Sequence, residues 1–504
     1  KGSFPYVSPE QTGRVNRDLD YRSDYYSLGV TLFELLTGRL PFEASTPLEW
    51  VHRHISQLPP PASRFRSDVP PALDGVLLRL LAKDADDRYQ STYGLVRDLE
   101  RCRVDPSFPL GQHDAPRRFQ VPRRLFGREA ELSRLYDAFG SVASGRSAFV
   151  TVSGWSGVGK SALVMELGRS IVGARGRLLE GKFDQFQQGT PYHALVAAMR
   201  GLARQLQAEP EAVLDALRAD LVERLGANAR LIVDLVPELS LVLGEPPPVV
   251  ALPPVEAQNR LQLAVVDFLG AFTSTPLVLF FDDLQWSDVP TLRLLRRIAT
   301  TRALTRILVV ATYRSNHVDA AHPLTLALEE IREQREIVAI ELLPLDRRAV
   351  RALVAATVGD HPETDALASV LADRTGGNAF YVTRLLERFW STGLLRFDPD
   401  AGRWRWDADA VAAADAGESV VHLLVDELRR LPGGVGDTLR LAACIGNTFD
   451  LRTLAAVCEA PESDVAADLL AAMKRDLVAP LSEDYALAGA SDVAVAYRFQ
   501  HDRV

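Results

Sequence analysis

A glycine-rich octapeptide follows a short apolar run near residue 150. Its sequence is Gly154-Trp155-Ser156-Gly157-Val158-Gly159-Lys160-Ser161, and the preceding residues 148–152, Ala-Phe-Val-Thr-Val, fit a buried strand. The pattern G-x-x-x-x-G-K-S between a strand and a helix is typical of a loop that binds nucleotide phosphates. Its glycines let backbone N–H groups turn towards an anion, and the following helix adds the positive end of its dipole. The octapeptide therefore predicts binding of ATP or GTP.

The last two residues of the octapeptide carry its side-chain chemistry. Lys160 is expected to reach the β and γ phosphates, and the Ser161 hydroxyl is expected to bind Mg²⁺. The alternative is a glycine-rich turn that arises by chance between a strand and a helix. The complete octapeptide, followed by apolar residues at helical spacing over residues 162–171, favours the phosphate loop.

A pair of carboxylates after a continuous apolar run is the second chemical signal. Residues 277–281, Leu-Val-Leu-Phe-Phe, predict a buried parallel strand, and Asp282 and Asp283 follow it. Ligands lie at the carboxyl ends of such strands, so Asp282 is expected to hold the Mg²⁺ shell. Asp283 is then expected to polarise an attacking water as general base. Taken alone these residues fit an Asp-rich turn, but together with the phosphate loop they predict hydrolysis.

A third strand is predicted over residues 306–314 and ends in Thr312, Tyr313 and Arg314. Thr312 or Arg314 is placed to sense the γ phosphate from the adjacent position in the sheet. An arginine at a strand terminus is about equally often a solvated surface residue, so this role stays open. The order of the segments favours an additional strand inserted between the phosphate loop and the acidic strand, which is the topology of AAA-like ATPases.

Several segments together resemble the predicted signalling ATPases of the STAND group, AAA-related switches that are fused to kinases or regulators in bacteria. They are the phosphate loop, Phe126-Gly127-Arg128-Glu129, Gly181-Lys182-Phe183-Asp184-Gln185-Phe186, Asp282-Asp283-Leu284-Gln285-Trp286-Ser287-Asp288, Thr312-Tyr313-Arg314 and Thr375-Gly376-Gly377-Asn378. The resemblance implies ATP and Mg²⁺ as cofactors, with Gly127 and Arg128 beside the adenine. The chain departs from the group at Gln285, where His is usual. It also has Ala379 in place of Pro, which removes any proline-dependent contact near Asn378.

The first hundred residues carry a different set of motifs. In chain order, Ser8-Pro9-Glu10, Asp24-Tyr25-Tyr26-Ser27-Leu28-Gly29-Val30 and Asp84-Ala85-Asp86-Asp87-Arg88-Tyr89 resemble the C-terminal lobe of a serine/threonine protein kinase. The resemblance implies a buried ion pair between Glu10 and Arg88, and it implies that Asp24 holds the catalytic loop. Residues 27–37 predict a mostly apolar helix that Gly38 and Pro41 end, so most of these residues are expected to hold the fold.

Other kinase motifs do not occur ahead of these segments. The sequence begins at Lys1 without a glycine-rich kinase loop, a strand lysine, a His-Arg-Asp motif or an Asp-Phe-Gly motif. We therefore expect this chain to be a piece of a longer protein. Its kinase-like part is expected to be inactive by itself, and its partners are expected to be other modules of the parent chain.

Composition limits the class of protein. The chain has 504 residues, of which 47% are hydrophobic and 24% charged, as in soluble multidomain proteins. Its formal net charge of −9 counts against a general nucleic-acid-binding surface. The 3 cysteines, Cys102, Cys444 and Cys458, follow no metal spacing and suit a reducing cytosol. The sequence has no apolar run that predicts a membrane span or a signal peptide, so we expect a cytoplasmic protein.

We predict a multidomain α/β and α protein. Residues 1–103 are the kinase-like helical C-lobe, the proline-rich residues 104–122 are a linker, and residues 123–345 are an AAA-like P-loop α/β domain with a parallel sheet and a helical insertion over 195–243. Residues 346–395 form a helical lid. Residues 396–504 hold a β-hairpin and a winged-helix-like domain, whose amphipathic helices cover 423–431, 435–444, 451–458 and 465–473.

Three functions stay open. The first is a kinase-linked signalling ATPase that binds and slowly hydrolyses ATP as a switch, with a homo-oligomer formed on ATP binding. The second is a regulatory scaffold that binds nucleotide without turnover, and the third is a transcription regulator whose winged helix binds DNA. The acidic balance counts against DNA binding, and Asp283 favours hydrolysis over the scaffold.

Overall fold

The computed structural model describes residues 3–12, 15, 17, 19–114, 119–184, 191–207, 209–398, 401, 403–413, 434–473, 477–481 and 495–499. The chain divides into two compact units. The first holds residues 1–183 and 190–412, and the second holds residues 184–189 and 413–504. Each unit has a hydrophobic core of its own.

The N-terminal part of the first unit is helical. Its α-helices are α1 (Arg22–Thr37), α2 (Pro47–Ser56), α3 (Pro71–Leu80) and α4 (Thr92–Cys102), and its 3₁₀ turns are Phe4–Tyr6, Glu10–Thr12, Ala62–Arg64 and Ala85–Asp87. Tyr26, Val30 and Phe33 of α1 form a core with Leu77 of α3. Gly38, at φ 68°, ends α1 because a left-handed C-cap favours glycine.

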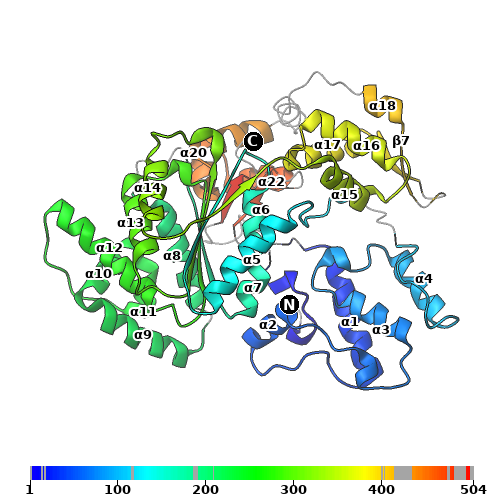
Figure 1. Cartoon of the computed structure of the whole chain (residues 1–504), viewed down its shortest axis with the longest axis horizontal. Helices are drawn as coiled ribbons and strands as arrows, with labels where there is room; N and C mark the ends of the chain where they lie inside the picture. Colours follow the sequence, from blue (N-terminus) through cyan, green and yellow to red (C-terminus); the bar gives the residue numbers. More distant parts are fainter. Residues whose placement is uncertain are drawn as a thin grey trace. The chain divides into compact units, whose positions relative to one another are not determined.

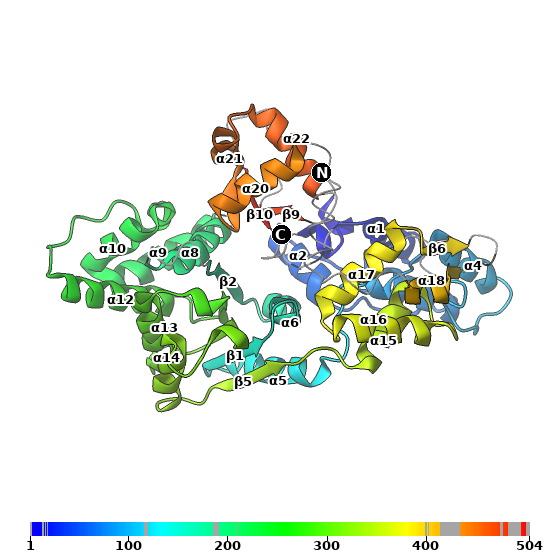
Figure 2. The same ribbon diagram turned by 90° about the horizontal axis from the view of Figure 1, so that it is seen from above.

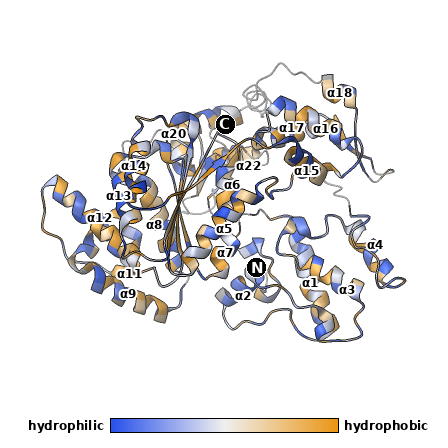
Figure 3. Cartoon of the chain, in the orientation of Figure 1, coloured by the Kyte–Doolittle hydropathy of each residue, from blue (hydrophilic) through white to orange (hydrophobic). Residues whose placement is uncertain are grey.

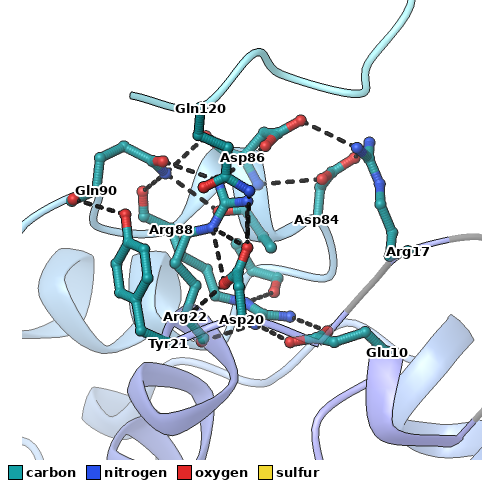
Figure 4. A network of polar contacts seen from close by, with 12 residues as sticks. Glu10, Arg17, Asp20, Tyr21, Arg22, Asp84, Asp86, Arg88, Gln90 and Gln120 are labelled. Atoms are coloured by element: carbon teal, nitrogen blue, oxygen red, sulfur yellow. Dashed lines mark hydrogen bonds and ion pairs between the residues drawn. The ribbon is translucent and has the colours of Figure 1, made fainter. Parts of the chain in front are cut away.

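A network of ion pairs joins the start of α1 and the turn at Glu10 to the segment over 84–88 (Figure 4). Arg88 is fully buried, and its Nη1 and Nη2 donate to Oε1 and Oε2 of Glu10 at 2.6 and 2.8 Å. Burial alone would raise the pKa of Glu10, but the hydrogen bonds and charge of Arg88 outweigh it and hold that pKa below its ordinary value. Asp24, in the first turn of α1, is exposed.

The first half of the predicted linker packs on the helices. Phe108 is buried, and the Asp114 carboxylate accepts hydrogen bonds from the backbone N–H groups of Gln90 and Ser91 and pairs with Arg79. Prolines in this stretch stop regular helix but not burial. Phe108 and Asp114 of the predicted linker therefore pack against the N-terminal helices, and the domain boundary at residue 103 stays a prediction.

A five-stranded sheet lies at the centre of the next part, and all its neighbouring strands run parallel. Its order is β2-β3-β4-β1-β5. The strands are β1 (Ala148–Gly154), β2 (Arg177–Lys182), β3 (Leu277–Asp282), β4 (Ile307–Arg314) and β5 (Val338–Leu342). The predicted parallel P-loop α/β domain is confirmed, and β4 lies between the phosphate-loop strand β1 and the acidic strand β3.

Helices cover both faces of this sheet (Figure 1). On one face, Leu279 and Val309 belong to a core that the sheet shares with the helices on that side. These helices are α8 (His193–Leu206), α9 (Glu211–Leu225), α10 (Ala229–Leu235), α11 (Ser240–Leu243), α12 (Pro254–Gly270), α13 (Val289–Thr300) and α14 (Pro323–Arg332). Phe280 and Leu308 face a second core with α5 (Glu129–Ala143), α6 (Lys160–Met165) and α7 (Gly168–Gly173). Because side chains alternate along a strand, burial of both faces explains the continuous apolar runs. Helices such as α9 and α12 carry both apolar and polar residues (Figure 3).

The predicted helical insertion over 195–243 corresponds to α8, α9, α10 and α11 with the 3₁₀ turns Gly226–Asn228 and Pro237–Leu239. Three helices follow β5 and lie side by side (Figure 2), namely α15 (Arg347–Val358), α16 (Thr364–Thr375) and α17 (Ala379–Ser391). We call these three helices the lid. The hairpin of β6 (Leu395–Asp398) and β7 (Arg403–Trp406) comes next, followed by α18 (Ala408–Ala413).

The second unit contains α20 (Val435–Ile445), α21 (Leu451–Val457) and α22 (Glu462–Met473) beside a small antiparallel sheet of order β8-β10-β9. Its strands are β8 (Thr448–Asp450), β9 (Val478–Pro480) and β10 (Ala496–Phe499). The predicted helix over 423–431 lies outside the described residues, and the winged-helix assignment stays a prediction. Within the described ranges, no helix is both long and apolar enough to cross a membrane.

Candidate nucleotide-binding site

The phosphate loop leaves β1 at Gly154 and enters α6 at Lys160. Gly157 and Gly159 have φ angles of 80° and 99°, in the left-handed region that favours glycine. A Cβ atom at position 157 would lie only 2.7 Å from Oδ1 of Asn378. The loop therefore needs glycine at position 157 both for its backbone angles and for a close neighbour.

Lys160 lies inside the curl of this loop. Its side chain is buried, and Nζ donates to the carbonyl oxygens of Gly154 and Trp155 at 3.2 and 2.9 Å. The ammonium group is therefore held at the concave side of the loop by the loop's own backbone. The Trp155 side chain, in contrast, is 65% exposed.

The Ser161 hydroxyl and the Asp282 carboxylate lie next to each other. Ser161 belongs to α6, the helix after the phosphate loop, and Asp282 is the last residue of β3. Ser161 Oγ donates to both carboxylate oxygens of Asp282, each at 3.0 Å, and Thr312 Oγ1 also donates to Asp282. Burial, followed by the charge of Asp283, raises the pKa of Asp282. A buried carboxylate beside a hydroxyl is the hard oxygen set that Mg²⁺ prefers, so these residues fit the predicted metal.

Asp283 leaves the strand in an unusual backbone conformation. Its φ angle is 57°, which is uncommon for a residue other than glycine, and its N–H donates to Thr312 Oγ1 at 3.2 Å. The carboxylate accepts from Nε of Arg314 at 3.1 Å, and Nζ of Lys182 lies 3.8 Å away. The predicted general base is therefore held in an ion pair.

Gln285 contributes to the site, although the sequence did not single it out for a role. It is 2% exposed, its Nε2 donates to Oδ1 of Asp283 at 2.8 Å, and its Oε1 accepts from the backbone N–H of Arg314 at 3.1 Å. It lies in the 3₁₀ turn Leu284–Trp286 directly after the carboxylates. The sequence did give one indication of this role, since the group that the chain resembles usually has His where Gln285 stands.

Arg314 is the last residue of β4 and pairs in register with Gly154, the first residue of the phosphate loop. Its side chain is 13% exposed, so it is not a solvated surface residue. The structure thus brings Lys160, Ser161, Asp282, Asp283 and Arg314 to the carboxyl edge of one sheet.

Arg128 contacts the phosphate loop, and Gly127 lies against α15 of the lid. Nη2 of Arg128 donates to the carbonyl oxygens of Val158 and Leu343 at 3.3 and 2.6 Å, and the side chain is buried. A Cβ atom on Gly127 would lie 2.6 Å from Cβ of Ala349 in α15. These contacts tie the phosphate loop to the chain after β5, and the implied position beside adenine stays a prediction. Gln185 and Phe186 of the Gly181 motif lie outside the described residues.

Comparison with known proteins agrees with this geometry. Residues 124–310 match the family model of the AAA ATPase domain. Hybrid signal transduction histidine kinase G of Dictyostelium discoideum is 30% identical over 576 residues, which cover 94% of this chain and 16% of that protein. Serine/threonine-protein kinase PknB of Mycolicibacterium smegmatis is 42% identical over 118 residues, which cover 23% of this chain and 19% of that protein.

Among solved structures, the Orc1 protein of Aeropyrum pernix in complex with DNA is 16% identical, with a TM-score of 0.33 over 76% of this chain and 91% of that one. A superposition of this quality carries no conclusion about the chain. The sequence relatives are much longer proteins, since the chain spans only 14 to 23% of the first three. The chain thus contains an AAA ATPase domain and is similar in sequence to serine/threonine kinases and histidine kinases.

Proposed function

We propose that this chain is part of a kinase-linked signalling ATPase, in which Mg²⁺ and ATP bind at the phosphate loop and slow hydrolysis acts as a switch. The observation that carries the proposal is the contact between the loop and the acidic strand, where Ser161 Oγ lies 3.0 Å from both oxygens of Asp282. Lys160 and the loop N–H groups would hold the phosphates, and Ser161 and Asp282 would hold Mg²⁺.

The arrangement also suggests why hydrolysis would be slow. A general base must accept the proton of the attacking water. The Asp283 carboxylate, however, is already paired with Arg314, and Gln285 donates a hydrogen bond to the same carboxylate oxygen. Because a γ phosphate carries more charge than one carboxylate, it would draw Arg314 away and release Asp283. The water oxygen would then bond to the γ phosphorus as the bond to the β–γ bridging oxygen breaks.

Two further elements of the proposal concern partners. A second copy of the chain would supply an additional arginine to the transition state, a contribution worth roughly 10³-fold or more in related chemistry. The kinase-like part and modules elsewhere in the parent protein would receive the output. The names of the relatives support a role in signalling, because they include histidine kinases and serine/threonine kinases.

The ion pair at Asp283 also favours a second candidate, a regulatory scaffold that binds ATP without hydrolysing it. If Arg314 stays on the carboxylate when ATP binds, the site has no free base. A DNA-binding role has less support, because α22 carries three acidic residues and no basic one, while α20 and α21 together carry only two basic residues and one acidic residue.

Single-turnover hydrolysis by the wild type, Asp283→Asn and Asp282→Asn separates these candidates. We expect Asp283→Asn to bind Mg²⁺ and ATP within a few-fold of the wild type but to release phosphate roughly 10² to 10⁴ times more slowly, since an amide keeps the shape and loses the basicity. Asp282→Asn should instead weaken the Mg²⁺ dependence of binding. Asp215→Asn, at an exposed position of α9, is the control. Equal hydrolysis by the wild type and Asp283→Asn would leave the scaffold as the surviving candidate.

A further inference from the structure

The lid contacts the phosphate loop through the loop's carbonyl oxygens. Nδ2 of Asn378 donates to the carbonyl oxygen of Ser156 at 2.9 Å, and the backbone N–H of Phe380 donates to that of Gly157 at 3.0 Å. Asn378 is 8% exposed, and its Oδ1 caps α17 at the N–H of Tyr381 at 3.4 Å. One asparagine therefore starts a lid helix and binds the loop that is expected to hold phosphate.

These hydrogen bonds determine in which direction N–H groups of the phosphate loop point. Each peptide plane is rigid, and its C=O and N–H point in opposite directions. Fixing the carbonyls of Ser156 and Gly157 towards the lid therefore fixes the N–H groups of the next residues, Gly157 and Val158, towards the other side. A Cβ atom at position 157 would lie 3.1 Å from Cβ of Phe380, so the loop passes close to the start of α17 at this glycine.

The far end of the same helix contacts the segment that leads into the ATPase part. Trp390, near the end of α17, stacks on Phe119 with ring centroids 5.1 Å apart and planes at 7°, and the buried Trp404 lies edge-on to Phe119. The next residue, Gln120, donates from Nε2 to Oδ2 of Asp20 at 3.0 Å, in the network of Figure 4. Helix α17 has 13 residues and is therefore about 20 Å long.

We propose that Asn378 is a positioning residue of the phosphate loop, and that α17 couples occupancy of this loop to the segment at Phe119. The proposal rests on nucleotide binding at the phosphate loop. Asn378 favours the loop conformation whose N–H groups accept phosphate, so binding and the contact stabilise each other. Because such coupling is reciprocal, anything that moves Phe119 on Trp390 would alter nucleotide affinity.

Asn378→Ser tests the first step, because serine keeps an oxygen that caps the helix but loses the amide donor to Ser156. Without nucleotide, hydrogen exchange of the loop peptide over 154–160 should quicken several-fold. With nucleotide, calorimetry should show ATP binding about five-fold weaker, as expected for the loss of one hydrogen bond. Thr383→Ala is the control, since Thr383 Oγ1 donates to the Ala379 carbonyl oxygen within α17.

Three outcomes of this experiment would overturn different claims. Unchanged loop exchange in Asn378→Ser would overturn the positioning role, whether or not the protein binds ATP. If the loop exchange quickens but neither wild type nor variant binds ATP, the proposed function fails while the positioning role holds. If Thr383→Ala changes exchange and affinity as much as Asn378→Ser does, general loosening of α17 explains the effect and the proposal is wrong.

Hydrogen exchange of the peptide over 119–124 tests the coupling step. On addition of Mg²⁺ and ATP, this peptide should become more protected in the wild type and in Thr383→Ala, and less so in Asn378→Ser. Protection in the wild type that is unchanged in the variant would show that α17 does not carry the coupling. Identical exchange with and without nucleotide in the wild type would overturn the coupling itself.

Discussion

Arg314 and Asp283 are joined by an ion pair across the ends of two adjacent strands, with Nε of the arginine 3.1 Å from Oδ1 of the carboxylate. The backbone of Arg314 pairs in register with Gly154, and Gln285 bonds to both partners of the ion pair. The candidate general base and the candidate phosphate sensor are therefore one unit, so changing either residue tests both.

Arg314→Ala should lower single-turnover hydrolysis by roughly 10²-fold while ATP affinity stays within a few-fold, because the arginine stabilises charge that develops on the transferred phosphoryl group. Arg293→Ala, at an exposed position of α13, is the matched control and should hydrolyse at the wild-type rate. A faster rate in Arg314→Ala would mean that the arginine only blocks Asp283.

Glu10→Gln should destabilise the N-terminal helices by about 3 to 5 kcal/mol, because it leaves the fully buried Arg88 without its charge partner. Hydrogen exchange of peptides from α1 measures this locally, which matters since a multidomain chain does not unfold in two states. Glu43→Gln, at an exposed position, should exchange like the wild type. Equal protection of α1 in Glu10→Gln would contradict a stabilising role for the pair.

The N-terminal helices should also lose stability as pH falls from about 6.5 to about 4. Burial, with a smaller effect from Lys83, lowers the pKa of His54 to about 4, while an unfolded histidine titrates near 6.5. On acidification, His54 therefore binds a proton in the unfolded state before it does so in the folded state. This difference lowers the free energy of unfolding by about 3 kcal/mol between pH 6.5 and pH 4.

His54→Phe provides the comparison for this pH effect. His54 bonds to the Tyr26 hydroxyl and the Phe4 carbonyl oxygen at 2.9 and 3.1 Å, so the variant should be less stable at pH 7. It should nevertheless lose less stability than the wild type between pH 6.5 and 4. Hydrogen exchange of α1 and α2 peptides, corrected for intrinsic rates, measures both, and parallel pH profiles would show that another group titrates.

Local patterns were sufficient for the central elements of the site. The phosphate loop and the acidic strand are continuous signals of strand, turn and charge, so their place at one sheet edge follows from parallel topology. Gln285 and Asn378 act through contacts 29 and 222 residues away in sequence, to Arg314 and Ser156, which no local pattern encodes. Burial of Asp114 was likewise missed, because proline-rich composition predicts irregular backbone but not whether it packs.

Titration calorimetry of Mg²⁺ and ATP into the wild type and Lys160→Ala tests the central claim most directly. Lys160 brings a positive charge to the concave side of the phosphate loop, so its loss should weaken ATP binding by orders of magnitude while circular dichroism stays that of the folded protein. Arg204→Ala, which removes an exposed cation from α8, should bind as the wild type does. Equal ATP affinity in the wild type and Lys160→Ala would contradict the assignment of this loop as a nucleotide site.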